Sequence, residues 1–180
     1  MFSRNPSKLA ALVAVCAAAS AAAQQGPNLG EPISATDLAP WDISVETDGT
    51  GLPPGSGDAA KGAQLYATTC VACHGAAGAG QPNDRLVGGQ GTLTQLHQVR
   101  TIGSFWPYAS TVFDYIRRAM PFHAPQSLSN DDVYSLTAYL LAENGIIRKN
   151  AKLDARALAR VQMPNRDGFI MAYPERADRR

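Results

Sequence analysis

Cysteine and net charge are both scarce in this sequence. The 180 residues include three cysteines, and 16 Lys and Arg against 15 Asp and Glu leave a formal net charge of +1. A net charge near zero gives no overall basic field for binding nucleic acid, so a nucleic-acid partner is not expected. Three cysteines are too few for a disulfide-stapled secreted scaffold, and an odd number cannot all pair with one another. Each cysteine therefore needs its own explanation.

No apolar run in the sequence is as long as a membrane span, and the longest run lies near the N-terminus. Arg4 and Lys8 form a positive start, Leu9–Ala19 is apolar, and small residues follow. This order predicts a secretory signal peptide over residues 1–23, which would export the protein to the periplasm and remove Cys16. A lipoprotein site at Cys16 and an ordinary N-terminal helix are the alternatives. The run is shorter than the ~20 residues of a membrane span, so no transmembrane segment is expected after cleavage.

The rest of the chain divides by charge into three zones. Residues 24–57 are rich in Pro and Gly and contain five acidic residues but no Lys or Arg, so we expect an extended acidic arm. Residues 58–147 are nearly neutral and form the expected domain. Residues 148–180 hold nine basic and four acidic residues and form a basic C-terminal extension. The two charged ends either are simply solvated or form a surface for a partner.

The middle zone carries three helix patterns and no convincing pair of strands. Each pattern has a residue that can cap its N-terminus, and apolar residues follow at helical spacing. A Gly-rich stretch from 75 to 103 separates the first two patterns, and so long a loop is usually functional or held by something else. The predicted helices are 59–66 after Asp58, 111–119 after Ser110, and a third that begins after Ser129 and ends near Gly145.

The sequence Cys70-Val71-Ala72-Cys73-His74 is a C-x-x-C-H motif. This spacing is the attachment signature of c-type haem, in which two thiols add to the porphyrin vinyl groups and the histidine binds the iron. A zinc site would need two further ligands, a thioredoxin-like pair would need a βαβ unit, and a disulfide across the motif is the third alternative. The motif predicts one haem c, bound through Cys70 and Cys73, with His74 as an axial ligand.

The second axial ligand must come from another part of the chain. Met120 lies 50 residues after Cys70, just past a predicted helix and directly before Pro121. We predict Met120 as this ligand, with His123 as the alternative, because the proline stiffens the turn between two predicted helices and can hold the thioether in place. A His/Met pair raises the potential and saturates the iron, which suits electron transfer. The other candidates are Met163 and Met171, which we expect to make contacts in the tail, and His97.

Together these features resemble a class I monohaem cytochrome c. The resemblance rests on CVACH, an early helix with Gly62 and Tyr66, a Met-Pro loop, and a last helix with Tyr139 and Leu140. It implies an all-α fold: a small cytochrome c fold of three to five helices around one covalent haem, with extended arms at both ends. In this family the first and last helices cross at small and aromatic residues and close the haem pocket.

A narrower resemblance extends beyond the haem motif. The sequence is similar to the cytochrome subunits of molybdenum sulfite dehydrogenases, including the SoxD-like proteins of the sulfur-oxidising system. This implies a molybdenum-containing catalytic subunit as electron donor and a cytochrome c or an oxidase as acceptor. The similar segments are Trp41-Asp42-Ile43, 51–57, 86–89, 105–108, 113–122, 124–128 and 163–168.

Several residues are candidates for hydrogen bonds to the haem and to its axial histidine. Class I cytochromes commonly use a proline carbonyl to accept the N–H of the axial histidine, and the acceptor here lies between Pro82 and Arg85. Trp106 and Tyr108 are candidate donors to the haem propionates, with Arg100 and Arg117 as cationic partners. Core packing is the alternative for the two aromatic residues.

Three functions fit these observations. An electron-transfer subunit would serve a separate catalytic chain. A peroxidase-like haem enzyme would need an open position on the iron, against which Met120 argues. A free electron shuttle would need only a compact body, against which the two long arms argue. We therefore expect an electron-transfer subunit of an oxidoreductase rather than its catalytic chain.

Overall fold

The computed structural model describes residues 30–170 and residue 172, and the chain divides into two units, Met1–Asp42 and Ile43–Arg180. In the first unit, the described residues contain one short helix, α2 (Ala35–Leu38), whose N-cap Ser34 accepts a hydrogen bond from the backbone N–H of Asp37. The predicted signal peptide, Cys16 and Met171 lie outside the described residues.

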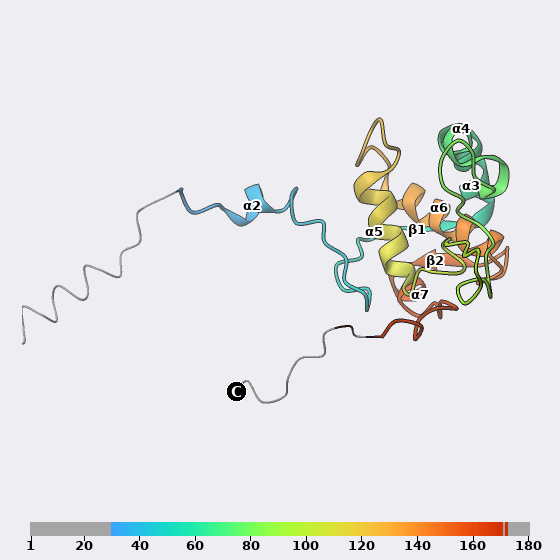
Figure 1. Cartoon of the computed structure of the whole chain (residues 1–180). Coiled ribbons are helices and arrows are strands. Elements are labelled where there is room, and N and C mark those ends of the chain that lie inside the picture. The colour runs from blue at the N-terminus through green and yellow to red at the C-terminus, as the bar shows by residue number, and fades with distance from the viewer. Residues whose placement is uncertain (1–29, 171, 173–180) are drawn as a thin grey trace, which may run out of the picture. The chain divides into compact units, whose positions relative to one another are not determined.

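The second unit is mainly helical (Figure 1). Figure 1 shows α6 between α5 and α3, and α6 contacts both of these helices. In the described part of the chain, no helix has the length and hydropathy needed to cross a membrane. In chain order the elements are β1 (Ser56–Asp58), α3 (Ala59–Thr69), α4 (Val71–His74), the 3-10 turn η1 (Ala76–Gly78), α5 (Ala109–Ala119), α6 (Asn130–Glu143), β2 (Lys152–Asp154) and α7 (Ala155–Ala159).

Two of the three predicted helix caps are confirmed. The Asp58 carboxylate accepts from the N–H of Lys61 at 2.9 Å, and the Ser129 hydroxyl accepts from the N–H of Asp132 at 3.2 Å. The prediction for Ser110 was wrong, because α5 begins two residues earlier, after Tyr108. Ser110 is buried in the first turn, and its hydroxyl donates to the carbonyl of Thr47 at 3.0 Å.

The expectation of no strand pair was also wrong. β1 and β2 pair antiparallel, with Gly57 opposite Leu153. Each strand has three residues, and about a hundred residues separate them, so neither shows an alternating pattern in the sequence. The pair packs on α6, where a Cβ atom at Gly57 would collide with Ser135.

The crossing of α3 and α6 forms the centre of the second unit. Gly62 allows close approach, because a Cβ atom there would meet the carbonyl of Ser135 and the side chain of Tyr139. The rings of Tyr66 and Tyr139 pack with their centroids 5.1 Å apart. Small and aromatic residues therefore meet where the resemblance placed them.

The segment after α6 contributes to the same core. Leu153, Leu158 and Met163 are all buried there. Composition changes at residues 57/58 and 147/148, whereas the compact unit begins at Ile43 and includes this C-terminal segment. The positions where the charge composition changes are therefore different from the boundary of the second unit at Ile43.

Asn144 holds part of the long Gly-rich loop. Its amide group accepts from the N–H of Gly88 at 3.0 Å and donates to the carbonyl of Leu86 at 3.1 Å. The side chain of Gln90 donates to the Asn144 carbonyl at 3.1 Å. The loop is therefore fixed to the C-terminal end of α6.

Candidate haem-binding site

The C-x-x-C-H motif lies on the short helix α4. Cys70 ends α3 and begins α4, and its carbonyl accepts from the N–H groups of Cys73 and His74 at 3.1 and 3.0 Å. Residues three apart on a helix lie on the same side, so the two cysteines can reach one edge of a flat ring. Cys70 and Cys73 form no disulfide with each other; Cys73 is exposed and Cys70 is partly buried. Burial raises the pKa of Cys70 to about 11, which keeps this thiol neutral at physiological pH.

The imidazole of His74 is fixed by a backbone group. Its Nδ1 atom lies 2.9 Å from the carbonyl oxygen of Asp84. A carbonyl can only accept, so Nδ1 carries the proton and Nε2 keeps its lone pair for a metal. The acceptor that the sequence placed between Pro82 and Arg85 is thus the carbonyl of Asp84.

The loop after α4 is folded back on the motif. The N–H of Asn83 donates to the carbonyl of Cys73, and the N–H of Gly80 donates to that of His74, both at 2.8 Å. The hydroxyl of Tyr66 donates to the carbonyl of Gly75 at 3.0 Å. Burial raises the pKa of Tyr66 to about 12, so the phenol remains a neutral donor at physiological pH.

The candidates for the second axial ligand differ in their surroundings. Met120 follows the last residue of α5 and is partly buried against the core. Met163 is only 4% exposed and fills the core, whereas His97 and His123 are both exposed. Met120 therefore remains the predicted ligand, because its thioether is sheltered without being enclosed in the core.

These residues fit a covalently bound haem. The donor set contains two thiols on one helix, an imidazole with its Nε2 lone pair available, and a sheltered thioether. Apolar side chains from several elements lie partly buried around the core, as expected for a surface that a large flat apolar group would cover. They include Leu65, Val71, Leu86, Val87, Trp106, Leu128 and Tyr139.

Comparisons with known proteins agree with this reading. The family model for cytochrome c matches residues 59–143. A chain in the crystal structure of the sulfane dehydrogenase SoxCD from Paracoccus pantotrophus has 44% sequence identity and a TM-score of 0.77. The match covers 85% of this chain and 74% of that chain. The chain belongs to the cytochrome c family. A comparison with curated protein sequences finds no match.

Family membership confirms the predicted cytochrome c fold and implies a haem c and electron transfer. The structural match also extends beyond the cytochrome c region. The family model covers less than half of the chain, whereas the match to the SoxCD chain covers 85% of it. Some of the flanking sequence is therefore shared with that relative.

The aromatic segment before α5 has partners that the sequence did not predict. The ring of Trp106 is partly buried and meets the ring of Tyr115 edge-on, with centroids 5.7 Å apart. The cation beside Tyr108 is Arg166, whose guanidinium carbon lies 5.1 Å from the ring centroid. Sequence reasoning missed Arg166, because nothing in the local pattern links the tail to this segment.

Arg100 and Arg117, the predicted cationic partners for the haem propionates, each contact another part of the chain. The guanidinium of Arg100 lies over the ring of Phe105 at 5.2 Å. That of Arg117 donates to the carbonyl of Ile43 at 3.4 Å. Their role toward the propionates stays a prediction.

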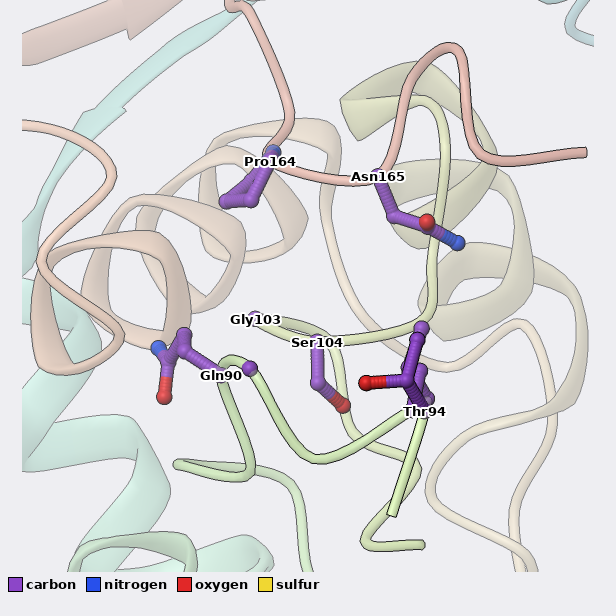
Figure 2. Close-up of a pocket in the computed structure, with 8 residues that line it drawn as sticks. Gln90, Thr94, Gly103, Ser104, Pro164 and Asn165 are labelled. Carbon is purple, nitrogen blue, oxygen red and sulfur yellow. The ribbon is translucent and has the colours of Figure 1, made fainter.

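A hollow of about 210 Å³ lies in another part of this cytochrome (Figure 2). Its walls come from the loop before α5 and from the C-terminal segment, and Cys70, His74 and Met120 are not among them. Polar side chains around the hollow include Gln90, Thr94, Ser104 and Asn165. This hollow is therefore separate from the candidate haem site.

Proposed function

We propose that this cytochrome carries single electrons on one haem c, attached through Cys70 and Cys73 and ligated by His74 and Met120. The hydrogen bond from His74 Nδ1 to the Asp84 carbonyl is the observation that carries this proposal. It fixes the tautomer in which Nε2 can bind iron, and it increases the basicity of the ring.

The haem supplies the one-electron couple, and the protein sets its position and potential. Cys70 and Cys73 would attach the ring through thioether bonds. His74, oriented by the folded-back loop, and Met120, with a neutral sulfur atom, would be the two iron ligands. Such a ligand set raises the potential and leaves no position on the iron for a substrate.

A peroxidase-like function would need an open position on the iron, and the sheltered thioether of Met120 opposes it. A redox titration and a peroxidase assay of the holoprotein together distinguish the two functions. We expect a single one-electron transition and no oxidation of dyes with hydrogen peroxide. Rapid peroxide turnover would overturn the electron-carrier proposal.

We further propose that the protein works in the periplasm as the electron-accepting subunit of a molybdenum dehydrogenase that oxidises sulfite. The sequence supports export through its signal-peptide pattern. The relative, named a sulfane dehydrogenase, supports a partner in sulfur oxidation and favours sulfane sulfur as a second candidate substrate. A soluble or membrane-bound carrier would then take the electron onward.

The N-terminal arm is suited to hold that partner. Trp41 is 80% exposed, and Ile33 and Leu38 are also exposed apolar residues. The arm is acidic and contains no Lys or Arg, so it fits an apolar groove with a basic rim. Ile43 is held in place, because its backbone carbonyl accepts hydrogen bonds from the guanidinium groups of Arg117 and Arg118 at 3.4 and 3.3 Å.

Stopped-flow reduction of the holoprotein tests the partner. A molybdenum dehydrogenase and either sulfite or a sulfane-sulfur compound are mixed with the oxidised cytochrome. We expect rapid reduction with sulfite, and reduction with the sulfane compound alone would assign the second substrate. No reduction with either would overturn the partner proposal.

Replacing Trp41 tests the arm. Trp41→Ala should slow reduction at least tenfold at low partner concentration and leave the midpoint potential unchanged, because the arm acts in docking. Leu96→Ala removes another exposed apolar side chain, outside the arm, and is the matched control. Equal rates for both variants and wild type would show that Trp41 does not dock the partner.

A further inference from the structure

The C-terminal segment 163–169 lies against the aromatic segment Phe105–Tyr108. The side-chain amide of Asn165 donates to the carbonyl of Phe105 at 2.7 Å. The rings of Phe169 and Phe105 meet edge-on, with centroids 5.2 Å apart. Met163 anchors the start of the segment in the core, where it is 4% exposed. Two contacts of different kinds thus join two segments about sixty residues apart.

Arg166 adds a positive charge to this contact. Its guanidinium lies over the ring of Tyr108 at 5.1 Å, in cation–π geometry, and the side chain is half-buried. Arg166 lies outside the residues 59–143 that match the cytochrome c family model. The contact is therefore a feature of the extension, added to the cytochrome c domain.

The segment held in this way continues into α5, the helix that ends at Met120. Tyr108 precedes the first residue of α5, and Trp106 packs against Tyr115 on that helix. The same helix ends immediately before Met120. Trp106 is also one of the apolar residues that lie partly buried around the core together with Cys70 and Met120. The segment Phe105–Tyr108 is therefore joined, through α5, to the chain position of Met120.

We propose that residues 163–169 form a clamp on Phe105–Tyr108, that Trp106–Tyr108 is one wall of the haem site, and that Arg166 acts through this wall as a positioning and charge-tuning residue for the haem. This inference rests on the proposed haem c function. A cation held near the haem disfavours the oxidised iron, which carries one more positive charge than the reduced iron, so Arg166 raises the midpoint potential. A guanidinium over Tyr108 is also suited to pair with a carboxylate such as a haem propionate.

The midpoint potential of the holoprotein tests the charge. Arg166→Gln should shift the equilibrium toward the oxidised form three- to tenfold, which lowers the potential by about 30–60 mV. Arg166→Lys keeps the charge and should restore most of the potential. Arg160→Gln removes the same charge from an exposed position in the same extension and should change the potential little.

Hydrogen exchange tests the clamp itself. Asn165→Ala removes the hydrogen bond to the Phe105 carbonyl, and it should speed amide exchange in residues 105–108 at least tenfold. Exchange in α3 should stay unchanged, which would show that the protein remains folded.

Two results would overturn the inference. One is an unchanged potential in Arg166→Gln, or a shift that Arg160→Gln reproduces in full. The other is unchanged exchange at residues 105–108 in Asn165→Ala. Both tests compare variants with wild-type holoprotein, so their failure counts against the clamp and the role of Arg166 alone. The proposed function fails separately, if the wild-type spectrum shows no methionine ligation.

Discussion

The Nδ1 atom of His74 lies 2.9 Å from the carbonyl oxygen of Asp84, ten residues further along the chain. The loop between them is held by backbone bonds to Cys73 and His74. The C-x-x-C-H motif supplies the groups that can bind haem, and this loop holds the His74 ring in one tautomer and one orientation. The fold therefore orients His74 as an iron ligand.

This relationship predicts a protected ring proton. In the reduced, diamagnetic holoprotein, proton NMR should show a slowly exchanging His74 Nδ1–H, because the proton is hydrogen-bonded to the Asp84 carbonyl. Nuclear Overhauser contacts should link it to protons of residues 84 and 85. A ring proton that exchanges at once with solvent would contradict this geometry.

The crossing of α3 and α6 depends on the absence of a side chain at Gly62. Gly62→Ala would push a methyl group into the Ser135 carbonyl and the Tyr139 side chain, and should lower the free energy of unfolding by about 1–3 kcal/mol. Ala60→Val adds bulk at an exposed position on the same helix and should cost less than about 1 kcal/mol. Urea unfolding of the holoprotein measures both, and equal losses would show that Gly62 is not a special contact.

The same two helices are joined by an ion pair that makes stability depend on pH. Lys61 Nζ lies 2.7 Å from Asp132 Oδ1, and hydrogen bonds from Lys61 and Ser129 lower the pKa of Asp132 below its usual 3.8. A lowered carboxyl pKa stabilises the fold above pH 3.8, and this stability is lost as the pH falls through the lower folded-state pKa.

Asp132→Asn tests this pH dependence. It should lower the free energy of unfolding at pH 7 by about 0.5–1 kcal/mol, a modest value because both side chains are partly exposed. The difference from wild type should shrink toward zero below pH 3.8. Asp42→Asn removes an exposed carboxylate from the acidic arm and should have no such effect. A pH-independent difference for Asp132→Asn would rule out the ion pair as its cause.

The sequence predicted what depends on local chemistry. The first and third helices begin directly after Asp58 and Ser129 as expected, because a side-chain cap and apolar periodicity lie within a few residues. The haem attachment motif is similarly local. The crossing at Gly62 and Tyr139 came from the family resemblance and is confirmed by their contact.

Other features could not be predicted because they depend on distant or backbone groups. The acceptor for His74 is a carbonyl, which every residue has, so the identity of Asp84 carries no signal. The three-residue strands are too short to show a period, and Arg166 reaches Tyr108 only because the chain returns after α7. Ser110 resembled a cap but lies inside the first turn, where it bonds to Thr47.

The most direct test of the central claim is the visible absorption spectrum of the oxidised holoprotein, with wild type and Met120→Ala compared. We predict one haem per chain and a weak band at the red end of the wild-type spectrum, which marks iron–methionine ligation. Met120→Ala should abolish this band and lower the midpoint potential, while His123→Ala leaves both unchanged. Retention of the band and the potential in Met120→Ala would contradict the proposed His74/Met120 haem.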